Sequence, residues 1–588
     1  MRKISPLLSS AAVMAALSAL ALGGCATTAG PGPIASAAPG APSPVEIDDT
    51  VSNYGLFLAG EAALQSGHSD EAAQYFSRAA LGAADQGPET RALIRDKAFT
   101  AAVMAGDIAT AATLAAPLDP TDGSAGQRLA RMVRAVDLLA QNKGKEADAV
   151  LTSPGAGLTY SAGLGLLRPW AAAAAGDAKR SVASVEGPQA ALTRVTGMYG
   201  QAQLLERDKR YDEAETDYKL LTAGQFSALY AIPYADFLQR RGRAKDAVTL
   251  YHDALQRTPN SRELKKALAR LEAKKGGAPA LPTLRQGAAQ ALTAAAEMSL
   301  IEKRFPDGQI YLRLALRLDP QEDEAWVFLG DILSQASDYD GARAAYGHVP
   351  ASSPDWLDAR QRIIASYEGE GDTATALKLA QELVKASPDD RDALVVEADL
   401  LRSAERFPEA VGVLDKVIAA NPAGADWALY FERGTSLDRA GRWPEAEKDL
   451  QKALVLRPDQ PDVLNYLGYS WVTRGEKLPQ AMVMLQKAYL AQPNSGEIAD
   501  SLGWAYYSLG DYKQAVQKLE RAVSLEPVNP EINDHLGDAY WRAGRRTEAQ
   551  YQWTRVLTLQ PAADTKTSAD RKLKDGLDPG PGANATRS

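Results

Sequence analysis

The chain has 588 residues, of which 45% are apolar, 24% are charged and 7% are aromatic, and its formal net charge is −9. One compact core rarely grows to that length, so several domains or an open repeat array are expected. The acidic balance, with no basic stripe along the chain, excludes nucleic acid as the expected partner. Abundant alanine favours closely packed helices over sheets, because alanine is the best helix former and is poor in strands.

The first thirty residues have the layout of an export signal. A short basic start is followed by an apolar stretch from about Leu7 to Leu22, and this stretch ends in Gly-Gly-Cys25. The stretch is too short and too weakly hydrophobic for a comfortable membrane span. Its end resembles the lipobox of bacterial lipoproteins, in which an apolar residue and two small ones precede a cysteine. We therefore predict a signal peptide over residues 1–24.

The lipobox resemblance implies that the sulfur of Cys25 carries a diacylglycerol and anchors the chain in a membrane. The alternative is that Cys25, the one cysteine in the chain, is an ordinary small buried residue. Ala26 is not the aspartate that retains lipoproteins at the inner membrane of enteric bacteria, so we expect an outer-membrane anchor that faces the periplasm. Residues 25–48 are rich in Ala, Gly and Pro and are predicted to be a disordered tether with a reach on the order of 25 Å.

The rest of the chain repeats with a nearly constant period. Small residues recur in Pro-Glu-Ala-like contexts at Ala214, Ala247, Gly308, Ala342, Ala376, Ala410, Ala446, Ala481, Ala515 and Ala549. Prolines keep the same period at Pro320, Pro354, Pro388, Pro422, Pro458, Pro493, Pro527 and Pro561. From Gly308 onward most of the small residues are 34 residues apart, which is the period of the tetratricopeptide repeat.

The repeats resemble the tetratricopeptide family in residue type as well as in period. One set at the family spacing is Trp326, Leu329, Gly330, Tyr339, Ala342, Tyr346 and Pro354; a second is Leu502, Gly503, Tyr506, Gly510, Tyr512, Ala515, Ala522 and Pro527. The resemblance covers most of residues 50–561. It implies an all-α solenoid, a right-handed superhelix of antiparallel helix pairs in which each pair buries its apolar face against its neighbours.

Composition and repeat quality predict four segments after the tether. Residues 49–259 form an N-terminal array of degenerate repeats, 260–285 a helix and a Gly/Pro linker, 286–561 a regular C-terminal array, and 562–588 a capping helix with a disordered tail. The linker at 276–282 is either a hinge or an ordered excursion.

No catalytic or metal-binding motif is present in the sequence. The four histidines, His68, His252, His348 and His535, lie far apart and lack metal-ligand spacing, and the chain has no phosphate loop or nucleophile elbow. Each histidine is interpreted as an ordinary surface or packing residue. We therefore expect a protein that is not an enzyme, with no cofactor, no metal and no small-molecule substrate.

In tetratricopeptide proteins the first helix of each pair lines the binding groove, so its exposed side indicates where a protein partner would bind. In the last three repeats these positions are Asn465, Tyr469, Asp500, Trp504, Tyr507, Asp534, Asp538 and Trp541. They form an aromatic stripe edged with carboxylates, which would repel a peptide carboxylate and favours an apolar or basic peptide or a folded surface. The alternative for each ring is packing between repeats; Trp471 and Trp553 sit nearer to core spacing.

Residues 460–561 resemble a group of large tetratricopeptide outer-membrane lipoproteins of Gram-negative bacteria. Some of these are adaptors that bring a periplasmic carboxyl-terminal processing protease to cell-wall hydrolases. The resemblance implies a non-catalytic adaptor whose partners are an envelope enzyme and its client. The alternative is a structural accessory of an outer-membrane secretion or polysaccharide-export machine.

Overall fold

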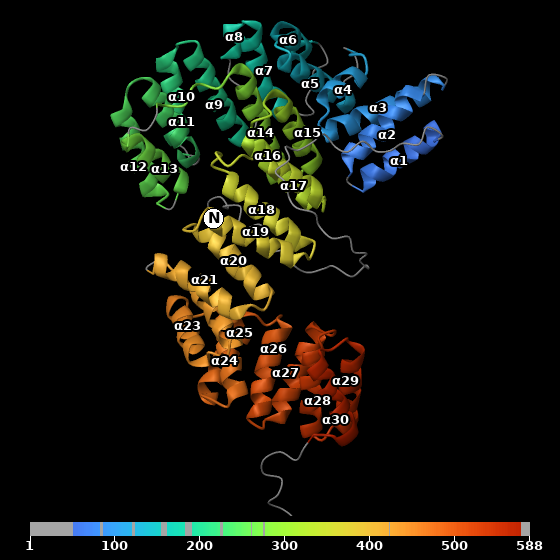
Figure 1. Ribbon diagram of the computed structural model, residues 1–588, viewed down its shortest axis with the longest axis vertical. Coiled ribbons are helices and arrows are strands. Elements are labelled where there is room, and N and C mark those ends of the chain that lie inside the picture. Colours follow the sequence, from blue (N-terminus) through green and yellow to red (C-terminus); the bar gives the residue numbers. More distant parts are fainter. Residues whose placement is uncertain are drawn as a thin grey trace, which may run out of the picture. The chain divides into compact units, whose positions relative to one another are not determined.

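The computed structural model describes residues 51–577 except 67, 83–85, 120–123, 154–160, 183–190, 224–226, 260, 274–276 and 423. The predicted signal peptide, Cys25, the tether and the tail after residue 577 lie outside the described residues, so those expectations stay predictions. Within the described residues the chain forms thirty α-helices and no strand (Figure 1), which confirms the predicted all-α solenoid of helix pairs.

Six helix pairs and one single helix precede the Gly/Pro segment. They are α1 (Asn53–Gln65), α2 (Ser69–Gly82), α3 (Pro88–Ala105), α4 (Ile108–Leu114), α5 (Ala125–Ala140), α6 (Gly144–Thr152), α7 (Ser161–Ala175), α8 (Ala178–Ser181), α9 (Ala191–Arg207), α10 (Tyr211–Ala223), α11 (Ser227–Arg240), α12 (Ala244–Arg257) and α13 (Arg262–Glu272). Several second helices are short here, down to four residues in α8, which fits the weak repeat pattern of this part.

Eight pairs and a final single helix follow it. They are α14 (Leu284–Ile301), α15 (Phe305–Leu318), α16 (Asp323–Gln335), α17 (Tyr339–Gly347), α18 (Trp356–Gly369), α19 (Thr373–Ala386), α20 (Arg391–Ser403), α21 (Phe407–Ala420), α22 (Trp427–Arg439), α23 (Trp443–Leu456), α24 (Pro461–Arg474), α25 (Leu478–Ala491), α26 (Gly496–Ser508), α27 (Tyr512–Leu525), α28 (Pro530–Arg542), α29 (Arg546–Thr558) and α30 (Ala563–Asp575).

The small residues that mark the repeat lie where two helices of a pair approach most closely. Each of the repeat-marking alanines from Ala214 to Ala549 is fully buried. A methyl group added at Gly503 would come within 2.7 Å of Leu519, and one at Gly330 within 2.3 Å of the Tyr346 ring. Larger residues at these positions would push the helices apart. The small residues of the repeat therefore recur where the backbones of two helices come closest.

The turn inside each pair requires a left-handed residue. Gly510 and Gly544 have φ angles of 80° and 81°, a region that glycine adopts without steric cost. Ser337 takes the equivalent conformation with φ 63° in a repeat that lacks the glycine. Gly510, one of the residues at the family spacing, thus lies in the turn between α26 and α27.

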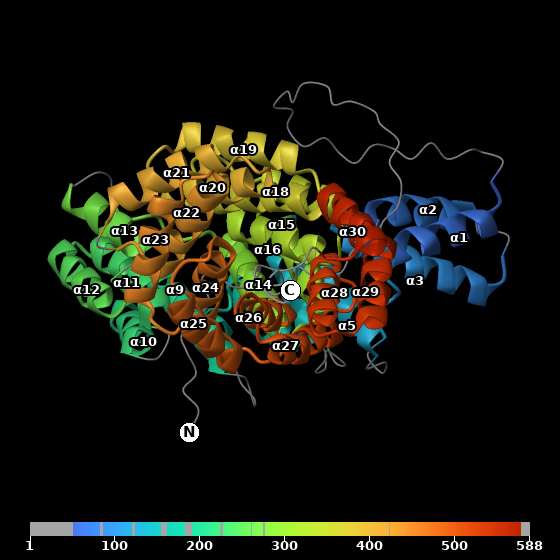
Figure 2. The same ribbon diagram turned by 90° about the horizontal axis from the view of Figure 1, so that it is seen from below.

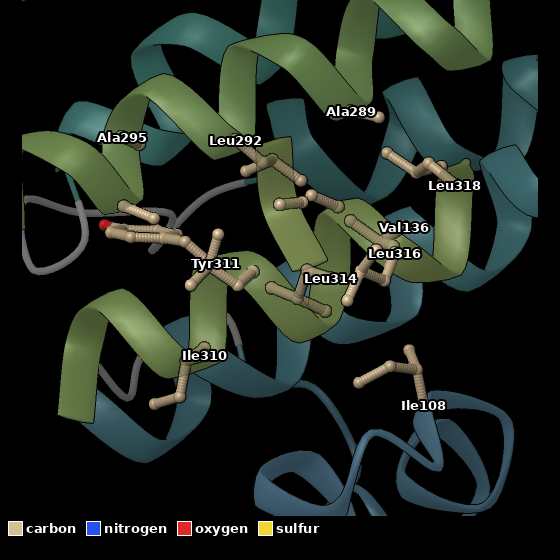
Figure 3. Close-up of a cluster of buried hydrophobic side chains, with 14 of the residues drawn as sticks. Ile108, Val136, Ala289, Leu292, Ala295, Ile310, Tyr311, Leu314, Leu316 and Leu318 are labelled. Atoms are coloured by element: carbon tan, nitrogen blue, oxygen red, sulfur yellow. The ribbon is translucent and has the colours of Figure 1, made fainter. Parts of the chain in front are cut away.

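The pair α14–α15 packs against the earlier helices as well as against the pair that follows it. α14 contacts α7 and α9, and α15 contacts α3, α4 and α5. Apolar side chains of these helices form one buried cluster (Figure 3). It contains Leu292 of α14, Leu314 and Leu316 of α15, Ile108 of α4 and Val136 of α5. Helices separated by more than a hundred residues therefore share a core.

Polar contacts fix the same pair to the earlier helices. The Arg317 guanidinium lies 2.7 Å from the Asp137 carboxylate of α5, and the Nε atom of Arg313 donates to the Met104 carbonyl oxygen at 2.8 Å. A glycine allows α14 to pack closely on α7. A methyl group at Gly287 of α14 would lie 2.1 Å from the Trp170 ring of α7. The first helices of the N-terminal repeats are thus partly covered by the chain itself.

The described part of the Gly/Pro segment, residues 277–283, is tied to the helices before it. A guanidinium nitrogen of Arg240 donates to the Pro279 carbonyl oxygen at 2.9 Å, and Arg207 donates to the Pro282 carbonyl oxygen. The division into an N-terminal and a C-terminal array at 260–285 stays a prediction, but the buried cluster of Figure 3 continues across it. None of the described helices is long and apolar enough to cross a membrane.

Candidate protein-binding face of the C-terminal repeats

The first helices of the last repeats stand side by side. α24 contacts α26, α26 contacts α28, and α28 contacts the single helix α30 (Figure 2). Their shared face is called the inner face below. The eight residues predicted to bind a partner all belong to α24, α26 and α28, so the repeat places them on neighbouring helices.

On α26 and α28 the structure brings together an aromatic stack. The Trp504 ring lies 4.6 Å from the Tyr507 ring and 4.1 Å from the His535 ring, with interplanar angles of 10° and 22°. Trp504 and Tyr507 are half-buried, whereas His535 is 8% exposed. Trp504 and Tyr507 are thus partly accessible, which suits aromatic anchoring of a partner.

The stack is held by a buried ion pair. The Nδ1 atom of His535 lies 2.9 Å from both carboxylate oxygens of Asp500, and both side chains are buried. Burial of the ring opposes its protonation, but the charge and hydrogen bond of Asp500 outweigh it and raise the pKa of His535. Asp500 is therefore engaged inside the array.

Asp534 and Asp538 are engaged in a similar way by the last helix. The Lys572 ammonium of α30 lies 2.7 Å from a carboxylate oxygen of Asp534 and 2.9 Å from one of Asp538. Asp538 also accepts a hydrogen bond from the indole nitrogen of the buried Trp553, at 3.0 Å. Burial raises the pKa of Asp538, and the Lys572 charge opposes that shift. These carboxylates join α28 to α30 and α29.

Trp541 lies against the end of α30, the last helix of the described residues. It is half-buried, with its ring 5.3 Å from that of Trp553, and a methyl group added at Gly576 would meet the Trp541 ring at 2.2 Å. Trp553 is fully buried and Trp471 is 4% exposed, which confirms the core spacing inferred for both. Packing is thus the larger role of the rings at this end of the array.

Asn465 and Tyr469 stand on α24, the first helix next to α26. Both are half-buried, and burial raises the pKa of the Tyr469 hydroxyl. The Oδ1 atom of Asn465 is buried without a hydrogen-bond partner. A buried acceptor of this kind is stabilised when a donor reaches it. Assignment of the eight residues to a partner site stays a prediction; on α24 and α26 its half-buried rings are Tyr469, Trp504 and Tyr507.

Sequence reasoning missed two residues that organise this face. His535 was interpreted as an ordinary residue, and Lys572 lay in a segment interpreted only as a cap. The signal was present in the repeat period, because Asp538 and Lys572 are 34 residues apart and Asp500 and His535 are 35 apart. Residues one period apart on first helices face each other across neighbouring repeats.

A half-buried carboxylate lies on one of the first helices before α24. In α22 the Glu432 carboxylate is half-buried and its Oε2 atom has no hydrogen-bond partner. Burial, followed by the charge of Asp399 in α20, raises the pKa of Glu432 to about 7. The expectation of a basic or apolar partner stays a prediction. Across the described ranges, no group of three or more His, Cys, Asp or Glu side chains is placed to hold a metal ion.

The ion pair on the inner face predicts a pH dependence of stability. The pKa of His535 is higher in the folded chain than in the unfolded one, so its contribution is complete below about pH 6.5, the unfolded value, and is lost as pH rises through the folded value. Glu531 and Asp538 also face the ring and act in the same direction. Hydrogen exchange of α26 and α28, measured from pH 6 to pH 9 and corrected for intrinsic rates, should show falling protection. His535→Gln should flatten this dependence; an equal slope in that variant would contradict it.

Comparison with known proteins identifies the repeats in this part of the chain. Models of the tetratricopeptide repeat match residues 368–430 and 431–496, and a model described as TPR repeat matches residues 503–544. A curated relative is human tetratricopeptide repeat protein 13, which is 27% identical over 182 residues. That match spans 30% of this chain and 19% of the human protein.

Solved structures of repeat proteins resemble the chain at low identity. A chain of the Cut9–Hcn1 hetero-tetramer of the APC/C is 16% identical, with a TM-score of 0.38 over 90% of this chain and 96% of that one. YrrB, described as a TPR protein with an unusual peptide-binding site, is 19% identical, with a TM-score of 0.26 over 33% of this chain and 97% of YrrB. The matched repeat models alone carry the assignment: residues 368–544 of this chain contain tetratricopeptide repeats, a family of protein-binding scaffolds.

Proposed function

We propose that the chain is a non-catalytic adaptor of the bacterial envelope, lipid-anchored to the outer membrane through Cys25 and facing the periplasm. Its repeats bind an envelope enzyme, a carboxyl-terminal processing protease, and bring it to a cell-wall hydrolase. Tethering both to one surface raises their effective concentration without any chemistry by the scaffold.

The observation that carries the proposal is a set of three half-buried aromatic rings on the inner face. Tyr469, Trp504 and Tyr507 are half-buried rings on neighbouring first helices, where repeat arrays present their binding surface. Half-exposed tyrosine and tryptophan supply large contact areas with little loss of conformational entropy. The lipobox-like end at Cys25 supports the membrane half of the proposal.

The test of the binding half is capture of partners from solubilised envelopes, with the captured proteins identified by mass spectrometry. The wild-type chain is compared with Trp504→Ala/Tyr507→Ala. The matched control is Tyr551→Ala, because Tyr551 is a 71% exposed ring on the second helix α29. We expect a protease or a cell-wall hydrolase in the wild-type and control eluates, reduced at least about tenfold by the double variant.

Two results would contradict the adaptor proposal. Capture that is equal in all three proteins would exclude Trp504 and Tyr507 as partner-binding residues, provided that circular dichroism shows the double variant to be folded. An outer-membrane channel or secretion component in place of an enzyme would indicate the structural accessory instead.

Cys25→Ala should move the protein from the membrane fraction to the soluble fraction. Two or more acyl chains anchor a protein stably, and a chain without the lipidated cysteine has none of them. Fractionation and immunoblotting of cells that express each form measure the effect. Membrane association of Cys25→Ala that survives a high-salt wash would contradict the lipid anchor.

A further inference from the structure

A cavity of about 350 Å³ lies between α7, α9 and α11 on one side and α14 and the start of α16 on the other. Its volume is at the lower end of the range of small ligand sites. The pair α14–α15 covers the first helices of the N-terminal repeats, and this cavity is space that the cover leaves open. It is distant in sequence from the inner face of α24–α30 and has no part in the adaptor proposal.

Aromatic rings and glycines form much of the cavity. Trp170 is 3% exposed and lines it together with Tyr199 and Tyr230, whose ring centres are 5.4 Å apart. The Trp170 ring packs closely on two glycines of the lining: a methyl group at Gly287 would lie 2.1 Å from it, and one at Gly200 3.4 Å away. The space therefore has faces against which an aliphatic stem or a cation can pack.

Glutamates are the acidic side chains in the lining of the cavity, and they have no basic counterpart there. Glu297, Glu322 and Glu324 contribute carboxylates, and no lysine, arginine or histidine is among the lining residues. Burial and then the charge of Glu324 raise the pKa of Glu322 to about 8, and burial raises the pKa of Glu297. The carboxylates thus lack the cationic partner that partly buried charges normally have.

A neutral acceptor in the lining also lacks a partner. The Oε1 atom of Gln290 on α14 is buried and accepts no hydrogen bond. Amide oxygens in such surroundings are normally satisfied, because an unpaired buried acceptor costs free energy. A ligand that donates hydrogen bonds and carries positive charge would satisfy this oxygen and the carboxylates together.

We propose that this cavity binds a lysine or arginine side chain that a protein partner presents. The aliphatic stem packs against the rings, and the ammonium or guanidinium group pairs with the glutamates and donates to Gln290. An anionic ligand would be repelled, and a purely apolar ligand would leave the carboxylates buried without a counter-charge. The inference deepens the proposed scaffold function, on which its protein partner rests, by giving the chemistry of a second contact.

The test is calorimetric titration of the full chain in detergent with acetylated, amidated pentapeptides. The peptides carry lysine, arginine or norleucine between alanines; norleucine has an aliphatic stem of similar length without the charge. Lysine and arginine peptides should bind at least tenfold more tightly than the norleucine peptide. Equal binding of the three would overturn the proposal.

Variants assign the binding to the cavity. Glu297→Gln/Glu322→Gln should weaken binding of the lysine and arginine peptides at least tenfold. It should not lower thermal stability, because these carboxylates have no internal partner to lose. Glu382→Gln, an exposed glutamate on α19, is the matched control and should leave affinity unchanged. If the double variant binds the lysine and arginine peptides with unchanged affinity, the assignment of binding to this cavity is overturned.

One further measurement distinguishes a protein side chain from a free diamine as the ligand. A second distinguishes the cavity proposal from the adaptor proposal. Cadaverine shares the ammonium chemistry; if it binds as tightly as the lysine peptide, the assignment to a protein side chain is overturned in favour of a free diamine. Trp504→Ala/Tyr507→Ala should leave peptide titration unchanged. Failure of envelope capture with intact peptide binding would therefore reject the adaptor and retain the cavity.

Discussion

Lys572→Ala should destabilise the C-terminal end of the array by about 3–5 kcal/mol, the usual cost of removing one partner from a buried ion pair. Lys572 is 7% exposed and is the ammonium that pairs with both Asp534 and Asp538. Without it the two carboxylates of α28 lie at the contact with α30 without a counter-charge, which disfavours docking of α30.

Hydrogen exchange resolved along the chain measures this effect locally. Protection of α28, α29 and α30 should fall at least about a hundredfold, while that of α14 and α15 stays unchanged, because each repeat depends mainly on its neighbours. The matched control is Lys574→Ala, which removes an exposed lysine from the same helix. Equal exchange in the two variants would show that the ion pair does not hold the last helix.

Gly287→Ala should destabilise the contact of α14 with α7 by about 1–3 kcal/mol, although alanine is the better helix former. The added methyl would lie 2.1 Å from the Trp170 ring, and that ring is itself buried. Neither side can give way without shifting the rings and helices of the shared core.

Gly412→Ala supplies a control of opposite sign. Gly412 lies in the interior of α21, and a methyl group there would meet no atom within 4 Å. This substitution should therefore stabilise the chain by about 0.5–1 kcal/mol. Exchange and limited proteolysis of α7 and α14 should rise in Gly287→Ala alone. Unchanged protection there would contradict the tight packing of α14 on the earlier helices.

Much of the candidate face was predictable from the sequence, and the reason is the repeat. The period assigned Asn465, Asp500 and Asp534 to equivalent positions on successive first helices, where the structure places them. Which side chains remain accessible was not predictable. Asp538 and Trp541 occupy the positions of Trp504 and Tyr507 in the next repeat, yet Asp538 is buried and pairs with Lys572 of α30, and Gly576 at the end of α30 packs on the half-buried Trp541 ring. The helix after the last full repeat occupies the position of a next first helix.

The sequence by itself determined the local units of this protein. Small residues at a 34-residue period, left-handed glycines such as Gly510 and prolines after the second helices each act within one repeat or between neighbours, so a periodic pattern suffices to read them. The helices, their pairing and their buried alanines follow from these local requirements.

Only the tertiary structure decided the long-range contacts. The packing of α14–α15 on α3, α5 and α7 and the cavity beside it join side chains whose partners no periodic rule names. Such contacts depend on how small rotations accumulate over many repeats and on which surfaces then meet. The Arg317–Asp137 pair, 180 residues apart, exists because of that accumulated geometry.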